Sequence, residues 1–296
     1  MYFDFLVKTL FISLFFMRFN TCNAVEQLSF SGGGAFGAVE IGILQKIRDM
    51  YPVKYDLYTG ISAGGLNAGF LSHYTNIDNG IIEIKNMYTT ILNRNVYSLI
   101  PETGVSIFNT TPLYNTMTKI IKNIGLDPII PTYIGAVNLY TGNLDTYLFN
   151  ENKLLEDKVL LLMSTSAIPI LFPPITYKKY MYVDGGTLSN ELLDVIHTNE
   201  YLNITYISPY GLMEENDTPI ETMKEMAMRT IQIITKNYNN PFTRLNHDCE
   251  EPRGEINYYF VENKLLENYN MLNFDNGKEL IQIGYNNMKY KHYKLC

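Results

Sequence analysis

Short apolar runs alternate with helical patterns at the start of the chain. Leu28–Phe30 is an apolar run that stops in a glycine-rich loop, and apolar residues then recur at helical spacing over 39–50. Pro52 ends that helix. Tyr55–Thr59 predicts a buried strand, and a second helix follows it. Strands that alternate with helices favour a parallel sheet covered by helices.

The same alternation returns after a less regular stretch. Residues 75–130 are rich in Ile, Tyr, Asn and Thr and contain three prolines, with a fourth directly after them at Pro131, which predicts an insertion or cap between core elements. Beyond this stretch we predict strands over Tyr133–Leu139, Leu144–Phe149, Tyr180–Val183, Ile204–Ser208 and Ile256–Val261, and helices over Leu154–Met163, Thr222–Ile234 and Lys278–Met288. The predicted fold is therefore α/β: a three-layer α/β/α sandwich around a mostly parallel central sheet.

The composition is that of a folded globular protein. Of the 296 residues, 46% are hydrophobic and 18% are charged, so a large core can form and global disorder is excluded. The formal net charge of -7 argues against nucleic acid as a partner, because binding to a polyanion needs clustered cations. The length fits one domain, which we place over residues 25–296.

The first residues predict a targeting segment. The apolar run Thr9–Met17 is too short to span a bilayer, and small residues stand before a cleavage position after Ala24. We therefore expect residues 1–24 to be a signal peptide and the protein to be secreted, to lie in the secretory pathway or to associate with a membrane. A membrane-surface segment and a first strand of the fold are the alternatives. Cys249 and Cys296 would remain after cleavage, and they can pair or stay free.

The run Gly60-Ile61-Ser62-Ala63-Gly64 has the pattern G-x-S-x-G. In this motif a serine nucleophile stands on a sharp turn between a strand and a helix, with Gly60 and Gly64 leaving room where the two elements meet. The helix N-terminus behind Ser62 would favour the negative charge that develops during a reaction. The alternative is a turn rich in glycine and serine that has no chemical role.

The glycine-rich loop Gly32–Gly37 lies between the first strand and its helix. It fits the pattern G-x-G-x-x-G, which can bind a dinucleotide, and it can also form a nest of backbone N–H groups that receives an oxyanion. Ser62 follows about 25 residues later, so the two loops should end adjacent parallel strands and lie side by side. This placement favours an oxyanion hole over a nucleotide site or a plain turn.

A third motif, Asp184-Gly185-Gly186, follows the predicted strand Tyr180–Val183. An aspartate at the carboxyl end of a strand stands where α/β sheets place their sites. Gly185 and Gly186 allow another backbone segment to approach closely. By itself this motif is an ordinary turn. It indicates a functional site only when it occurs together with the glycine-rich loop and the G-x-S-x-G motif.

Together and in this order, the three motifs resemble those of the patatin-like phospholipase family, whose signature is a glycine-rich loop, a G-x-S-x-G elbow and a D-G-G or D-G-A turn. Thr165–Pro169 and Phe172–Pro173 are similar to the block that precedes the aspartate in that family. The resemblance covers about residues 27–200, and residues 201–296 are expected to complete the same domain. Ser31 departs from the family by standing where an aspartate often precedes the glycines.

The resemblance implies a Ser–Asp dyad. Ser62 would attack an ester carbonyl and form an acyl-enzyme, while Asp184 would accept the serine proton and return it to the leaving alcohol. Because a carboxylate is a weak base unless its pKa rises, Asp184 should lie in an apolar, partly desolvated site. The backbone N–H groups that would hold the oxyanion belong to Gly32, Gly33, Gly34, Ala35 and Gly37.

The implied activity is hydrolysis of phospholipids or other fatty acyl esters at a membrane surface. One alternative is an α/β-hydrolase esterase with a Ser-His-Asp triad, for which His197 or His247 stands in the usual order and His73 and His292 are the other histidines. The other alternative is a non-catalytic lipid-binding protein on the same fold. No metal-binding spacing occurs in the sequence, so we expect neither a metal nor a cofactor.

Two aromatic and Ile-rich stretches, Tyr88–Ile100 and Tyr133–Phe149, can line an acyl pocket or meet a bilayer, although ordinary core packing is the favoured interpretation. The C-terminal stretch 289–294 combines lysines with tyrosines. Here the solvated end of a helix is favoured over a contact with anionic lipid headgroups. Both features are therefore assigned to the fold and not to the reaction.

Overall fold

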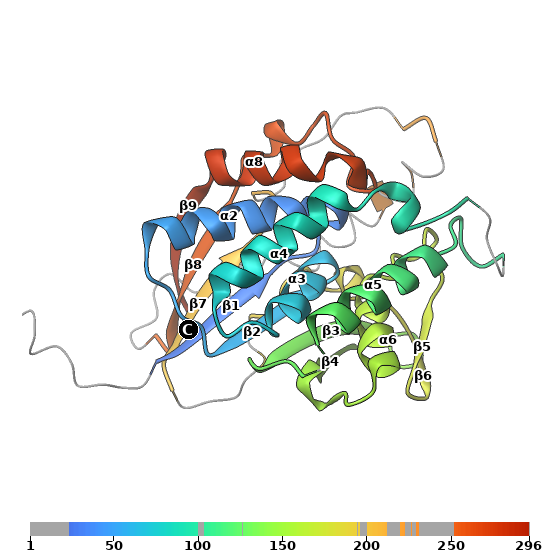
Figure 1. Ribbon diagram of the computed structural model, residues 1–296, viewed down its shortest axis with the longest axis horizontal. Coiled ribbons are helices and arrows are strands. Elements are labelled where there is room, and N and C mark those ends of the chain that lie inside the picture. Colours follow the sequence, from blue (N-terminus) through green and yellow to red (C-terminus); the bar gives the residue numbers. More distant parts are fainter. Residues whose placement is uncertain are drawn as a thin grey trace, which may run out of the picture.

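The computed structural model describes residues 24–99, 104–125, 127–193, 195, 200–211, 220–222, 226, 229–230 and 252–295 (Figure 1). Several predictions concern residues outside these ranges. They include the signal peptide apart from its last residue, Cys249 and Cys296, His197 and His247, and most of the helix predicted over Thr222–Ile234. The structure does not test these predictions, and they stay predictions from the sequence.

One mixed sheet of nine strands organises the part of the chain that the structure describes. Its order is β5 (Ile175–Tyr177), β6 (Tyr180–Asp184), β3 (Thr132–Asn138), β2 (Leu57–Ile61), β1 (Val25–Phe30), β7 (Leu202–Ile207), β8 (Gly254–Phe260) and β9 (Lys289–Leu295), with β4 (Leu144–Leu148) also paired to β3. The run β3-β2-β1-β7-β8 is parallel throughout. β4 and β6 run antiparallel to β3, β5 to β6, and β9 to β8.

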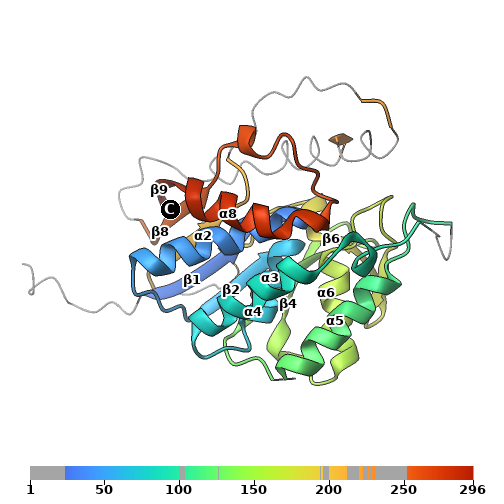
Figure 2. The same cartoon turned by 45° about the horizontal axis from the view of Figure 1, so that its top comes forward.

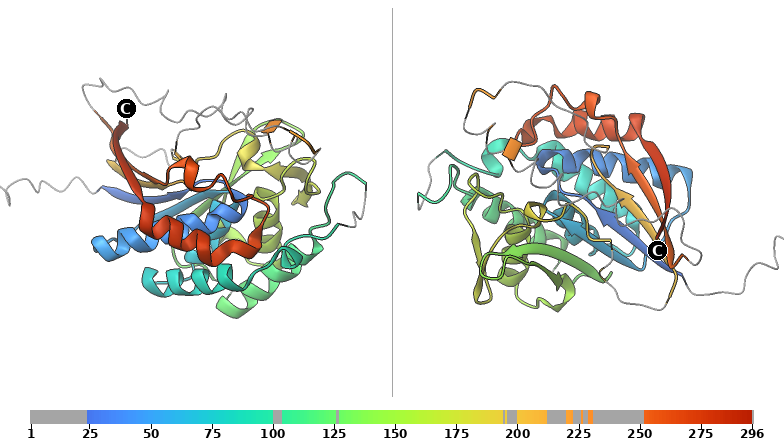
Figure 3. Two further views of the ribbon diagram at one scale, coloured as in Figure 1. Left: turned by 90° about the horizontal axis from the view of Figure 1, so that it is seen from above. Right: turned by 180° about the vertical axis from the view of Figure 1, so that it is seen from behind.

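Helices flank this sheet. They are α2 (Gly37–Met50), α3 (Ala63–Leu71), α4 (Ile77–Thr90), α5 (Thr111–Ile124), α6 (Leu155–Thr165) and α8 (Gly277–Asn287). α2 and α8 lie side by side in two views (Figure 1, Figure 2). Seen from above, both lie with α4 on one side of the strands (Figure 3). The arrangement confirms the predicted α/β fold with a mostly parallel central sheet.

The prediction of an irregular insertion or cap over 75–130 is wrong about regularity, because this stretch contains the two long helices α4 and α5. Pro112 suggested a break, yet it stands in the first turn of α5, where no backbone N–H is needed. The buried residues Leu113, Met117 and Ile121 of α5 recur every fourth position and give the helix one apolar face. The many β-branched and polar residues concealed this periodicity in the sequence.

The C-terminal stretch is also different from the prediction. Lys289–Leu295 forms the edge strand β9, paired with β8 along its whole length, and is not the end of a helix. Most of its side chains are exposed. Lysines on an edge strand discourage pairing with another chain, which accounts for their frequency here without any lipid contact.

The chain that follows β6 crosses the second face of the central strands. Gln27, Ser29 and Thr59 are buried polar residues on this face, and all three donate hydrogen bonds to the Leu192 carbonyl, at 3.0, 3.4 and 2.7 Å. Polar side chains in the middle of a sheet are stable here because each one has a partner. The contact holds the segment after Asp184 against β1 and β2.

Candidate active site

β3 aligns the two strands that carry the predicted site residues. Ile61, the last residue of β2, pairs with Gly135, and Asp184, the last residue of β6, pairs with the next residue, Ala136. β2 is parallel to β3 and β6 is antiparallel to it, so the carboxyl ends of β2 and β6 point toward each other. This register brings Ser62 next to Asp184, although 122 positions separate them in the chain.

Ser62 and Asp184 are hydrogen-bonded in a buried site. Ser62 Oγ donates to Asp184 Oδ2 at 2.6 Å, and the N–H of Gly186 donates to Asp184 Oδ1 at 2.7 Å. The two side chains are 6% and 5% exposed. Desolvation by burial raises the pKa of Asp184 from 3.8 to about 7, although the two hydrogen bonds act in the opposite direction. The carboxylate is therefore a much better proton acceptor than an exposed aspartate.

Ser62 stands on the sharp turn that the motif predicts. Its φ is 54°, a left-handed conformation that is uncommon for residues other than glycine. A methyl group at Gly60 would lie 2.2 Å from the Gly64 carbonyl oxygen, and one at Gly64 would lie 2.3 Å from the Ser31 carbonyl oxygen. The two glycines thus allow strand, turn and neighbouring loop to approach as closely as they do.

Thr165 holds the turn from below, a contact that the sequence did not reveal. Its hydroxyl accepts a hydrogen bond from the N–H of Ser62 at 2.8 Å and donates one to the Gly135 carbonyl at 2.6 Å. Thr165 is fully buried at the end of α6. Its place in the block Thr165–Pro169 was the only indication of importance in the sequence.

The backbone N–H groups of the glycine-rich loop differ in whether they are already bonded. Gly32 donates to the Asn190 carbonyl at 3.3 Å, and Ala35 donates to the Met271 carbonyl at 2.7 Å. Gly37 donates to carbonyls of the loop itself. The expectation that Gly32, Ala35 and Gly37 offer free donors to an oxyanion is therefore corrected: their amides hold the loop in shape.

Three backbone N–H groups near Ser62 are open, which means that they donate no hydrogen bond within the described part of the protein. Among the described residues, the N–H groups of Gly33, Gly34 and Ala63 donate no hydrogen bond to the protein. Gly34 lines the same cavity as Ser62. Its φ is 57°, and a methyl group there would lie 2.3 Å from the Met271 carbonyl oxygen, so glycine is needed on both counts.

A buried polar network joins the loop to the helices behind it. Glu40 accepts hydrogen bonds from the N–H of Ser31 and from Asn67 Nδ2, both at 2.9 Å, and the hydroxyl of Tyr88 donates to Asn67 Oδ1 at 2.9 Å. Glu40 is fully buried, and desolvation raises its pKa well above the usual value. In the sequence, this network is indicated only by a glutamate within the apolar run of α2.

An apolar cavity of about 60 Å³ opens beside Ser62. Its walls come from α3, α4 and α5 and from the chain after α6. In Figure 1, α4 and α5 lie on either side of α3. The lining residues are Gly34, Ser62, Ala63, Leu66, Phe70, Met87, Tyr88, Ile91, Val96, Leu113, Thr116, Met117, Ile120, Ser166, Ile168, Phe172 and Phe274. The stretch Tyr88–Ile100 thus contributes to the pocket, whereas Tyr133–Phe149 does not.

Four of the lining side chains carry hydroxyl groups, and each hydroxyl donates to a partner within the protein. The bonds run from Ser62 to Asp184 Oδ2 (2.6 Å), from Tyr88 to Asn67 Oδ1 (2.9 Å), from Thr116 to the Asn95 carbonyl (2.8 Å) and from Ser166 to the Leu162 carbonyl (2.9 Å). A ligand inside would therefore meet a hydrocarbon surface. Such a surface selects for an alkyl chain over a polar group.

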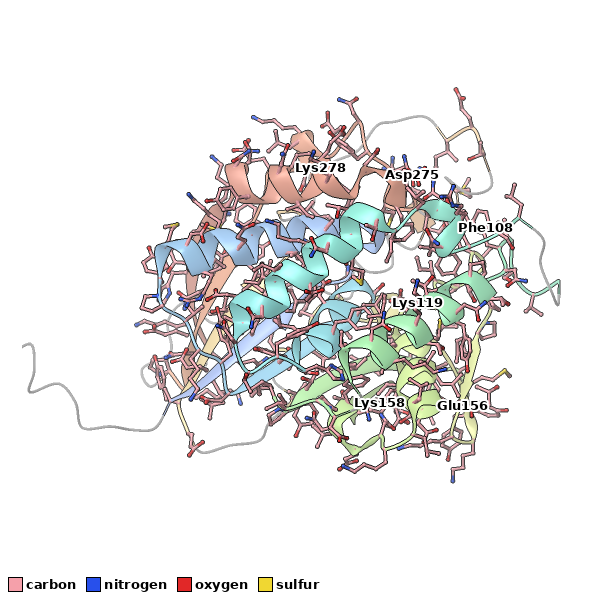
Figure 4. All side chains as sticks on the ribbon, in the orientation of Figure 1. Phe108, Lys119, Glu156, Lys158, Asp275 and Lys278 are labelled. Atoms are coloured by element: carbon pink, nitrogen blue, oxygen red, sulfur yellow. The ribbon has the colours of Figure 1, made fainter. Side chains whose placement is uncertain are left out.

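Aromatic rings surround the end of the cavity near the site. Tyr97 packs against Phe108, Phe172 and Phe274, with ring centroids 4.6, 6.1 and 6.5 Å apart. Phe108 and Asp275, distant in the sequence, lie at this same end of the molecule (Figure 4). Asp275 accepts a hydrogen bond from the N–H of Asn93 at 2.9 Å. The C-terminal part of the chain therefore helps to build the site.

The described histidines lie away from Ser62. His73 is buried at the end of α3, where Nδ1 lies 3.0 Å from the Gly69 carbonyl, and desolvation lowers its pKa. His292 is exposed on β9 beside Asn257. Neither side chain forms a hydrogen bond with Ser62 or Asp184.

No group of His, Cys, Asp and Glu within the described ranges is arranged to hold a metal ion. No helix among the described residues is both long enough and apolar enough to cross a membrane.

Comparisons with known proteins were consistent with these motifs. The family model described as patatin-like phospholipase matches residues 28–196, which is more than half of the chain. Among solved structures, the chain is similar to VipD from Legionella pneumophila, with 14% identity and a TM-score of 0.43 over 90% of this chain and 68% of that one. It is also similar to the ExoU–SpcU complex of the Pseudomonas aeruginosa type III secretion system, with 11% identity and a TM-score of 0.30 over 91% of this chain and 53% of that one. No curated protein sequence matches the chain significantly.

Proposed function

The chain belongs to the patatin-like phospholipase family, and from this premise we propose that it is a lipid acyl hydrolase that cleaves fatty acyl esters through an acyl-enzyme on Ser62. The observation that carries the proposal is the 2.6 Å hydrogen bond from Ser62 Oγ to Asp184 Oδ2 beside an apolar cavity that Ser62 lines. Phospholipids are the favoured substrates because the matching family is one of phospholipases and because they carry an alkyl chain directly beside the ester bond.

In the first half of the reaction, Ser62 Oγ attacks the carbonyl carbon of the ester while Asp184 takes the hydroxyl proton. The carbonyl oxygen becomes an oxyanion, and we expect the N–H groups of Gly33, Gly34 and Ala63, which donate to no other group in the described part of the chain, to receive it. The tetrahedral intermediate then collapses. Asp184 gives the proton to the departing alcohol, and the acyl group remains on Ser62.

In the second half, water replaces the alcohol. Asp184 takes a proton from a water molecule that attacks the acyl-enzyme, and the same N–H groups hold the second oxyanion. Collapse releases the fatty acid and returns the proton to Ser62 Oγ. A pKa of about 7 suits this double use, because the carboxyl group can both accept and donate a proton near neutral pH.

The cavity gives the acyl chain a place next to the reacting atoms. Gly34 and Ser62 line it, and the remaining surface is almost entirely hydrocarbon. An ester whose carbonyl oxygen points to Gly34 would therefore send its alkyl chain inward and leave its alcohol part, including any headgroup, outside. This orientation makes the alcohol the leaving group, as the mechanism requires.

The test combines labelling with product analysis. A fluorophosphonate should form one adduct on Ser62, and phospholipid vesicles should yield free fatty acid with the wild type but not with Ser62→Ala. Ser72→Ala is a matched control, because Ser72 is a buried serine just after α3 that does not line the cavity. Fatty acid release that persists in Ser62→Ala would reject the assignment, and an unlabelled Ser62 without hydrolysis would favour a lipid-binding protein.

A further inference from the structure

The cavity follows one face of α3 away from the nucleophile. Ser62, Leu66 and Phe70 are spaced four positions apart, so their side chains lie one above another on the same face of the helix. All three line the cavity. At the rise of an α-helix, Phe70 lies roughly 12 Å beyond Ser62 along the axis. The cavity is thus an elongated channel with Ser62 at one end.

α5 forms the opposite wall with a matching stripe. Leu113, Thr116, Met117 and Ile120 line the channel at spacings of three and four, which is one face of a helix. Leu113 lies at the end near the site, since it lines a narrow crevice together with Ser166. Ile120 is two turns further along α5. It therefore belongs to the same distal end of the channel as Phe70.

The orientation of α4 agrees with this assignment. A methyl group at Gly37, in the loop beside the nucleophile, would contact the Tyr88 hydroxyl at 2.4 Å, so the C-terminal half of α4 lies near the site. A methyl group at Gly80 would lie 2.6 Å from Leu71, so the first half of α4 lies at the end of α3. The two helices are antiparallel, and Phe70 lies at the end remote from the site.

We propose that Phe70, together with Ile120, closes the distal end of the channel and sets the length of acyl chain that the enzyme prefers. This inference rests on the proposed function. Phe70 is 3% exposed, and of the α3 residues that line the channel it is the farthest from Ser62. An extended chain advances about 1.2 Å per bond, by analogy with an extended backbone, so a channel of roughly 12 Å holds about ten carbon atoms.

The side walls can adapt to such a chain. The free space of about 60 Å³ is small, and an alkyl chain must enter in single file. Met87 lines the channel from α4 and Met117 lines it from α5, and methionine side chains change conformation at little cost. The aromatic ring of Phe70 has no such freedom. Chains of medium length are therefore favoured over long ones, whose ends would have to displace this ring.

The test is a chain-length profile with p-nitrophenyl esters from butyrate to palmitate. The wild type should favour octanoate or decanoate, and Phe70→Ala should raise the ratio of kcat/KM for palmitate to that for octanoate by about tenfold, because a few added methylene contacts discriminate on this scale. The ratio compares two substrates in one preparation and does not depend on the folded fraction. Phe70→Leu should shift it in the same direction if Phe70→Ala does not fold.

Two further variants complete the design. Ile120→Phe should shorten the channel and lower the decanoate-to-butyrate ratio below that of the wild type. Leu71→Ala is the matched control, because Leu71 is the fully buried neighbour of Phe70 on α3 and does not line the channel. Its profile should be that of the wild type.

The outcomes distinguish the proposed role of Phe70 and Ile120 from the proposed function of the enzyme. Hydrolysis by the wild type with unchanged ratios in the Phe70 and Ile120 variants would overturn the role of these residues and leave the proposed function standing. A shifted profile in Leu71→Ala equal to that of Phe70→Ala would overturn it as well, because the effect would then come from loosened packing. Absence of ester hydrolysis together with an unlabelled Ser62 would instead reject the proposed function itself.

Discussion

The hydroxyl of Thr165 accepts a 2.8 Å hydrogen bond from the backbone N–H of Ser62. The nucleophile has a φ of 54°, which is costly for serine, and this bond ties its backbone to the end of α6. The same hydroxyl donates to the Gly135 carbonyl on β3, the strand that also aligns Asp184. One side chain therefore fixes the turn to the strand that brings the two site residues together.

Thr165→Val should slow the reaction while Thr165→Ser should retain most of it. Valine removes the hydroxyl and leaves the buried N–H of Ser62 without an acceptor, which costs about 1–3 kcal/mol. If the turn distorts and this free energy is added to the activation barrier, kcat drops by about tenfold to a hundredfold. Steady-state kinetics with a melting curve for each variant measures this, and equal kcat in Thr165→Val and the wild type would contradict it.

Local motifs made the central part of the site predictable from the sequence. The turn around Ser62 needs glycine on both sides, and the packing of Gly60 and Gly64 against neighbouring carbonyls explains why the motif is readable in so few residues. Asp184 was predictable only through the order of the motifs and the family resemblance. Its contact with Ser62 depends on a register between β2, β3 and β6 that no short stretch of sequence encodes.

What the sequence did not reveal depends on long-range contacts. Met271 engages the N–H of Ala35 from the far end of the chain, so the number of open oxyanion donors cannot be counted in the loop alone. α4 and α5 build the channel, yet their polar and β-branched residues read as an irregular insertion. The confirmed fold class, by contrast, follows from strand and helix alternation, which is a local property.

Glu40→Leu should destabilise the protein more than Glu40→Gln. Leucine deprives Asn67 Nδ2 of an acceptor in a fully buried position, which costs about 1–3 kcal/mol. Glutamine has nearly the same shape and keeps one of the two oxygens that accept these bonds, and burial raises the pKa of Glu40 well above its usual value, so that loss of the charge is the smaller change. Urea unfolding compares the variants. If Glu40→Gln were as unstable as Glu40→Leu, the negative charge and not the hydrogen bonds would be what the fold requires.

The activity should fall as pH drops through about 7. Asp184 has to be ionised to accept the serine proton, and its pKa is raised to about 7 by desolvation. Below this value kcat/KM should decrease about tenfold per pH unit, the slope of a single protonation. A pH profile with a soluble short-chain ester measures this without interference from a lipid surface. An acid limb near pH 4 would show that the aspartate is not desolvated in solution.

Asp184→Asn should be nearly inactive while it remains folded. The amide has almost the shape of the carboxylate but cannot accept a proton, and loss of the base costs serine hydrolases about 10⁴-fold. His73→Ala, His197→Ala, His247→Ala and His292→Ala should each stay within about tenfold of the wild type, the scale of an indirect packing effect. A histidine variant that lost as much activity as Ser62→Ala, with an unchanged melting temperature, would replace the dyad by a triad.

The same substitution should increase the stability of the protein at neutral and alkaline pH. The pKa of Asp184 is about 7 in the folded protein and 3.8 in the reference state, so the folded state binds the proton more tightly. Wild-type stability is therefore highest below pH 4 as far as this group is concerned, and it declines as pH rises toward 7, by up to about 4 kcal/mol.

Asparagine carries no charge at any pH and avoids that decline, although it gives up part of the hydrogen bonding to Ser62 and Gly186. The melting temperature of Asp184→Asn should therefore exceed that of the wild type above pH 7, and the difference should shrink as pH falls toward 4. Calorimetry of both proteins across this range measures the effect, with Asp145→Asn as a control on a half-buried aspartate outside the site. A wild type that equals or exceeds Asp184→Asn in stability above pH 7 would mean that the ionised carboxylate is well solvated, and its strength as a base would then need another source.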